Sequence, residues 1–148
     1  GQRPKVANRA KADLFVSLHF NAAASTAASG FESYALTPQF QASSKYRRPT
    51  GKDAIRYQGN EQDPWNALIT YHLERALVQR LGGPDRGMKR ARWAVLKSLR
   101  CPGVLTELGF MSHAATAKKL RLPAFRQTLA QALFEGIVAY RERLQRIQ

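Results

Sequence analysis

The sequence predicts an α/β fold in which a mostly parallel sheet is flanked by helices on both faces. Short apolar runs alternate along the chain with longer segments of helical periodicity, which is the pattern of an α/β domain. The apolar runs at 14–19 and 103–110 are continuous. Continuous runs are typical of strands that are covered on both faces, as in a parallel sheet.

The first part of the chain predicts the end of a helix followed by two strands. Residues 1–13, GQRPKVANRAKAD, form the helix end and the turn into a strand. The run LFVSLH at 14–19 is the first strand, and the small polar residues at 21–29 form a loop. The segment GFESYAL at 30–36 is a second strand with alternating side chains.

Residues 37–63 show little periodicity. A short helix is predicted around Phe40–Tyr46, followed by a long surface loop, RRPTGKDAIRYQGNEQ, at 47–62. Loops of this length inside a compact domain often carry function. We therefore expect the segment 47–62 to face the substrate or to gate access to it.

Two longer segments predict amphipathic helices. The first has Asp63 as its N-cap and Pro64 at its first helical position, and the residues Gly-Gly-Pro at 82–84 end it. The second is opened by Pro123. Apolar side chains keep helical spacing in both segments. The first stripe contains Trp65, Leu68, Ile69, His72, Leu73, Ala76, Leu77 and Leu81, and the second contains Phe125, Leu129, Leu133, Ile137, Tyr140 and Leu144.

A basic segment at 86–100 lies between these helices and surrounds a short strand predicted at Trp93–Leu96. The whole chain has a formal net charge of +14, which favours anionic partners such as nucleic acid, an acidic lipid surface or an anionic cell-wall polymer. Basic residues are spread over the whole chain and no nucleic-acid-binding motif is found, so no specific nucleic-acid partner is expected. No apolar run approaches the roughly 20 residues of a membrane helix, so no membrane span is expected.

Two polar residues at strand ends are the candidates for chemistry. His19 ends the run at 14–19, and Glu107 lies near the end of 103–110 among apolar neighbours. Sites in open α/β sheets lie at the carboxyl ends of strands. A histidine can hold a metal ion, and a buried carboxylate with a raised pKa can act as a general base, as in zinc hydrolases. The alternatives are a hydrogen-bonded structural histidine and a buried ion pair between Glu107 and an arginine.

The other histidines and the single cysteine are weaker candidates. His72 is interpreted as a packing residue on a helix face, and His113 as an exposed loop residue. Cys101 precedes Pro102 at the start of a strand, which is the wrong end for the predicted site and argues against a nucleophilic role. The residues alone therefore reveal no further metal ligands.

Four motifs follow one another along the chain: ANRAKADLFVSLHFNA, GFESYAL, DRGMKRARWAVLKSLRCPGVLTELGFMSH and LPAFRQTLAQALFEGIVAY. Their order and spacing resemble the zinc-dependent N-acetylmuramoyl-L-alanine amidases of the bacterial cell wall. The resemblance implies one partial amidase domain at 1–148, with an insertion or loop at 38–62. It also implies hydrolysis of the amide between N-acetylmuramic acid and L-alanine in peptidoglycan, in the periplasm or cell envelope.

The same resemblance implies roles for both candidate residues. His19 matches the last zinc-binding histidine of the family, in the pattern S-x-H-x-N, and Glu107 matches its catalytic glutamate, in E-x-G-F-x-S. The family's first zinc histidine, in a Gly-His-Gly turn, and its ligand glutamate have no counterpart in this sequence. The chain is thus expected to be the carboxyl-terminal two-thirds of a domain, without the first sheet strands, with the two other Zn²⁺ ligands upstream. The first alternative is a non-catalytic amidase-like module that binds peptidoglycan, and the second is a basic nucleic-acid-binding domain.

Overall fold

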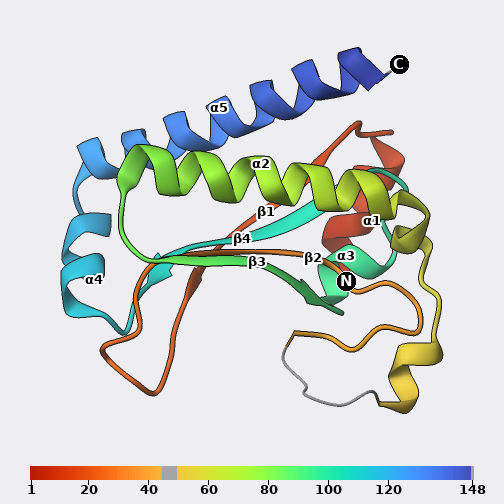
Figure 1. Ribbon diagram of the computed structural model, residues 1–148, viewed down its shortest axis with the longest axis horizontal. Helices are drawn as coiled ribbons and strands as arrows, with labels where there is room; N and C mark the ends of the chain where they lie inside the picture. Colours follow the sequence, from red (N-terminus) through yellow and green to blue (C-terminus); the bar gives the residue numbers. More distant parts are fainter. Residues whose placement is uncertain (45–49, 148) are drawn as a thin grey trace.

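The structure is a computed structural model that describes residues 1–44 and 50–147 (Figure 1). Its elements follow the chain as α1 (Gln2–Arg9), β1 (Phe15–Asn21), β2 (Phe31–Leu36), the 3₁₀ helices η1 (Gly51–Ala54) and η2 (Gln58–Gln62), α2 (Asp63–Leu81), β3 (Asp85–Ala91), α3 (Ala94–Lys97), β4 (Gly103–Phe110), α4 (Ala114–Leu120) and α5 (Pro123–Ile147).

The strands form one sheet in the order β1-β4-β2-β3. β1 pairs with β4 in parallel, and so does β2 with β3, whereas β2 and β4 are antiparallel. Helices α2 and α5 lie side by side over one face of the sheet, and α1 and α3 lie on the other face (Figure 1). The prediction of a mostly parallel α/β sheet with helices on both faces is therefore confirmed.

Each face of the sheet has its own apolar core, and β4 contributes to both. Val104 and Leu108 point toward α2 and α5, while Leu105 points toward α1 and α3. Because side chains alternate along a strand, Glu107 must share the α1–α3 face with Leu105. All eight residues of β4 are buried, as its continuous apolar run predicts.

Helices α2 and α5 approach closely at Gly136. A Cβ atom at this position would lie 2.8 Å from Leu73 Cδ2 and 3.0 Å from the His72 carbonyl oxygen. Glycine therefore allows the two backbones to pack at this distance, although it lowers the helix propensity of α5.

The first strand differs from its prediction in one respect. β1 lies at an edge of the sheet, not in its interior. Leu18 and Phe20 are consequently 54% and 48% exposed, although the continuous run predicted cover on both faces.

The basic segment folds differently from its prediction. The strand is β3, at Asp85–Ala91, and the predicted strand Trp93–Leu96 is instead the N-cap and the first three residues of α3. β3 is the other edge of the sheet and is largely polar. It therefore lacks the apolar alternation by which strands are found in a sequence.

The segment between β2 and α2 also needs correction. Residues 40–44 are not helical, and the remainder of the predicted helix, 45 and 46, lies outside the described residues. The predicted loop at 47–62 contains η1 and η2 within its described part, 50–62. A buried ion pair anchors this segment: Asp53 of η1 pairs with Arg92, which follows β3.

Two helix starts were mispredicted. Asp63 is the first residue of α2 rather than its N-cap, which is Gln62, and its carboxylate lies 3.5 Å from Arg90. His113 is not an exposed loop residue: it is half-buried and is the N-cap of α4, where its side chain accepts a hydrogen bond from the Thr116 backbone N–H. Helix α5 begins at Pro123 as predicted.

Candidate active site

Three polar side chains that are candidates for a functional site lie in one row across the sheet. His19 of β1 pairs with Glu107 of β4, and Glu107 pairs with Glu32 of β2. Residues that pair across neighbouring strands project from the same face. The sheet therefore brings the two residues predicted from the sequence together, and it adds a second carboxylate beside them.

Glu107 is a buried carboxyl group without a compensating cation in the part of the chain that the structure describes. Its side chain is 8% exposed, and the described residues offer it no ion pair and no hydrogen bond to Oε2. Burial raises its pKa to about 7, with a further contribution from the negative charge of Glu32. The alternative of a structural ion pair with an arginine is thus not found within the described residues, and a group that titrates near pH 7 suits a general base.

His19 resembles Glu107 in having a buried polar atom without a partner among the described residues. Its Nε2 atom is buried and has no hydrogen-bond partner among the described residues. A bare imidazole nitrogen of this kind is the group that binds a metal ion. Within residues 1–44 and 50–147, however, no cluster of three or more histidine, cysteine or acidic side chains is arranged to hold a metal. His19 therefore fits one ligand position, and the described residues do not supply a complete site.

Glu32 differs sharply from Glu107, although the two lie opposite each other. Its Oε2 accepts from Arg86 Nε at 2.8 Å and pairs with Lys89, and its Oε1 accepts from Asn21 Nδ2 and Tyr34 Oη, each at 2.7 Å. Burial acts to raise its pKa, but the hydrogen bonds from Lys89, Arg86 and Tyr34 outweigh burial and lower it. Glu32 is therefore ionised at neutral pH, next to a carboxyl group that holds its proton up to about pH 7. Two carboxyls with separated pKa values are a common active-site arrangement.

A bulge in β3 brings both cations to Glu32. In a regular strand, Arg86 and Lys89 would point to opposite faces, because their spacing is odd. Phe31 pairs with Asp85 but Ser33 pairs with Met88, so β3 holds one extra residue here. Gly87 has a φ of 77°, a left-handed conformation that favours glycine and marks such a bulge.

A pocket of about 670 Å³ opens over the two carboxyl groups of this row. Glu107 and Glu32 line it, and its walls come from the exits of β1 and β3, from α3 and from the segment before α2. The lining includes the aromatic residues Tyr34, Tyr57, Trp93 and Phe110 and the cations Lys52, Arg86, Lys89, Arg92 and Lys97. Described residues of the predicted 47–62 loop thus line the same pocket as Glu107.

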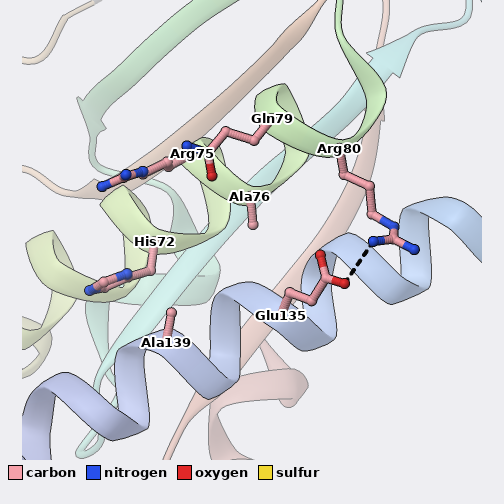
Figure 2. Close-up of a pocket in the computed structure, with 7 residues that line it drawn as sticks. All are labelled: His72, Arg75, Ala76, Gln79, Arg80, Glu135 and Ala139. Carbon is pink, nitrogen blue, oxygen red and sulfur yellow. Dashed lines mark hydrogen bonds and ion pairs between the residues drawn. The ribbon is translucent and has the colours of Figure 1, made fainter.

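A second pocket, of about 480 Å³, lies between α2 and α5 (Figure 2). Arg80 and Glu135 form an ion pair of 2.7 Å across it. His72 lines this pocket, where it is half-buried and packs edge-on against Tyr71. Burial lowers its pKa, and the neighbouring Arg75 and Arg143 lower it further. His72 thus lies on the opposite face of the sheet from Glu107.

Cys101 also lies away from the site. It is buried, and this burial raises the pKa of its thiol. It precedes β4, whereas Glu107 lies near the end of that strand. A thiol that resists ionisation at the wrong end of the strand agrees with the prediction against a nucleophilic role.

Sequence reasoning missed Glu32 as a member of the site. The sequence did contain one signal: Glu32 is a charged residue inside a predicted strand, between Phe31 and Ser33. Its cationic partners lie 54 and 57 residues further along the chain and reach it only through the β3 bulge. Local sequence does not reveal that geometry.

Comparison with known proteins assigns this chain to a family. The model of the N-acetylmuramoyl-L-alanine amidase family matches residues 1–139. The amidase LytC of Bacillus subtilis is 32% identical over 139 residues, which cover 94% of this chain and 24% of LytC. The sporulation-specific N-acetylmuramoyl-L-alanine amidase of the same organism is 33% identical over 135 residues, covering 91% of this chain and 43% of that protein.

Solved structures agree with the fold. The catalytic domain of CwlV, an N-acetylmuramoyl-L-alanine amidase from Paenibacillus polymyxa var. colistinus, has a TM-score of 0.71 and 27% identity. The match covers 95% of this chain and 64% of that one. The chain thus spans less than two-thirds of the relatives named here. It belongs to the N-acetylmuramoyl-L-alanine amidase family.

Proposed function

We propose that this chain carries the general base of an enzyme that hydrolyses the amide between N-acetylmuramic acid and L-alanine in peptidoglycan. The observation that supports this most is the pairing of His19 with Glu107, each with a buried polar atom that has no partner among the described residues. Such atoms are costly in a folded protein unless a ligand or substrate uses them. Membership of the amidase family supplies the reaction class.

Glu107 is the proposed general base. Its pKa of about 7 allows it to take a proton from water near neutral pH and to return that proton to the departing amine of L-alanine. The ionised Glu32 stays fixed by its cations and keeps the proton affinity of Glu107 high. In this proposal Glu32 positions charge and does not contact the reacting atoms.

His19 is the proposed zinc ligand of the chain. Its unpartnered Nε2 fits this role. Zinc, when bound, would lower the pKa of a coordinated water. The described residues offer no complete set with the two further ligands expected for this family, a histidine and a glutamate. The segment 38–62 is proposed to be an insertion that forms a wall of the substrate pocket.

The proposed place of action is the cell envelope, where peptidoglycan is found. The high positive charge of the chain suits an anionic wall. Among the described residues, no helix has the length and apolar character needed to cross a membrane.

Digestion of purified peptidoglycan tests the proposal. The intact protein, expressed from its full reading frame and supplied with zinc, is expected to release free stem peptides without cutting the glycan chain. Glu107→Gln should lower the rate by about 10²–10⁴-fold, the range typical for removal of a general base. Lys118→Gln, an exposed change on α4, serves as the control. If the intact protein bound peptidoglycan and released no stem peptide, the non-catalytic module would be the better description.

A further inference from the structure

The cations around the Glu107 pocket are not equivalent. Arg86 and Lys89 share the single carboxylate of Glu32, and Arg92 pairs with Asp53. The two remaining lining cations, Lys52 and Lys97, have no carboxylate partner among the described residues. Residues 45–49 and 148 contain no aspartate or glutamate.

Lys97 is held in place, whereas Lys52 is exposed. The ammonium of Lys97 lies 4.7 Å from the centre of the Tyr57 ring, within the range of a cation–π contact. The half-buried Lys97 ends α3, and that helix is anchored by the buried Leu96. A lysine that is already ordered and partly desolvated loses less entropy when it binds an anion.

Trp93 belongs to the same wall as Lys97. It is the N-cap of α3, Lys97 is the last residue of that helix, and both side chains line the pocket. Trp93 is 39% exposed and packs edge-on against Tyr34 at 5.6 Å. The hydroxyl of Tyr34 in turn donates to Glu32, which connects this wall to the carboxylates on the sheet.

We propose that Lys97 is the subsite for a carboxylate of the stem peptide, on the amine side of the amide that is cut, with Trp93 packing against the peptide. The inference rests on the proposed function, which places the reacting amide at Glu107 in the same pocket. The leaving peptide always carries at least one carboxylate.

Two dipeptides test this subsite without any turnover. One is L-alanyl-γ-D-glutamate with a free α-carboxylate, and the other is the same peptide with that carboxylate converted to an amide. Their dissociation constants are measured on the intact protein by calorimetry. We expect the acid to bind about 10-fold more tightly than the amide, as one charge-assisted hydrogen bond would give.

Variants at Lys97 identify the residue that is responsible. Lys97→Gln should weaken binding of the acid by about 10-fold and leave the amide unchanged, so that the preference disappears. Lys97→Arg keeps the charge and should keep the preference. Lys118→Gln on α4 is the matched control and should behave as the parent protein does.

The outcomes separate the subsite from the proposed function. Equal binding of the two peptides by the parent protein, or an equal loss of both in Lys97→Gln, would overturn the subsite. Peptidoglycan hydrolysis together with equal binding would reject the subsite alone. A Lys97-dependent preference in a protein that released no stem peptide would uphold the subsite and reject the amidase activity.

Discussion

Glu32 and Glu107 face each other across the antiparallel strands β2 and β4, yet among the described residues only Glu32 has cations to compensate its charge. The electrostatic environments of the two carboxyl groups are therefore asymmetric. One carboxylate is fixed and ionised, and the other is buried with a pKa of about 7. This asymmetry leads to the first of four predictions.

Glu32→Gln should weaken both the fold and the reaction. The amide cannot balance Arg86 and Lys89, which would then turn toward Glu107 and make it a weaker base. Because both cations are partly exposed, the loss of unfolding free energy should be only about 1–2 kcal/mol. Urea denaturation measures the first effect and peptidoglycan digestion by the intact protein the second. Unchanged hydrolysis in this variant would exclude the role given to Glu32.

Glu74 of α2 should make stability depend on pH. Burial raises its pKa from 4.5 to about 7, although Ser33 Oγ donates a hydrogen bond to it at 2.6 Å. Between these pH values the folded state keeps a proton that the unfolded state has released, so stability falls as pH rises, by on the order of 3 kcal/mol. Glu74→Gln should remove this part of the pH dependence of stability. The stability of the variant relative to the parent protein should therefore be higher at pH 8 than at pH 4.

Denaturation in urea at the two pH values measures this difference. Glu107 has a similar pKa but is present in both proteins, so the comparison isolates Glu74. Glu142→Gln, an exposed change on α5, is the control and should leave the slope as it is. The prediction would be contradicted if Glu74→Gln and the parent protein differed in free energy of unfolding by the same amount at pH 4 and at pH 8.

Gly136→Ala should destabilise the packing of α2 against α5. Helix propensity alone favours alanine by about 1 kcal/mol. The new methyl group would meet the fully buried Leu73 and the backbone of His72, and overpacking of this kind costs about 1–3 kcal/mol. We expect packing to win and thermal unfolding to occur at a lower temperature. Gly51→Ala, where a Cβ atom meets nothing within 4 Å, should show no such loss.

The 148-residue chain by itself should retain little zinc and hydrolyse little peptidoglycan. His19 is the one proposed ligand, and the described residues form no cluster of three or more potential metal ligands. Metal analysis after dialysis should find zinc well below one equivalent, and His19→Ala should remove most of what remains. Stoichiometric zinc with activity would mean that another side chain, such as Glu32, completes the site.

The parts of the fold that the sequence reveals are those stabilised by apolar burial. Strand β4 and helices α2 and α5 follow from their apolar patterns, and His19 and Glu107 stand out as polar residues at the ends of apolar runs. Strand β3 was missed because a polar edge strand has no apolar alternation. The Asp53–Arg92 and Glu32–Arg86 pairs were missed because contacts across 39 and 54 residues depend on tertiary geometry.

The register of β1 with β4 has a practical consequence for redesign. Hydrogen bonding between neighbouring strands fixes their spacing at about 4.8 Å, so the distance between the His19 and Glu107 backbones does not depend on any loop. The walls of the pocket are built separately, from α3 and the segment before α2. The proposed substrate contacts of Trp93 and Lys97 can therefore be altered while His19 and Glu107 keep their relative geometry.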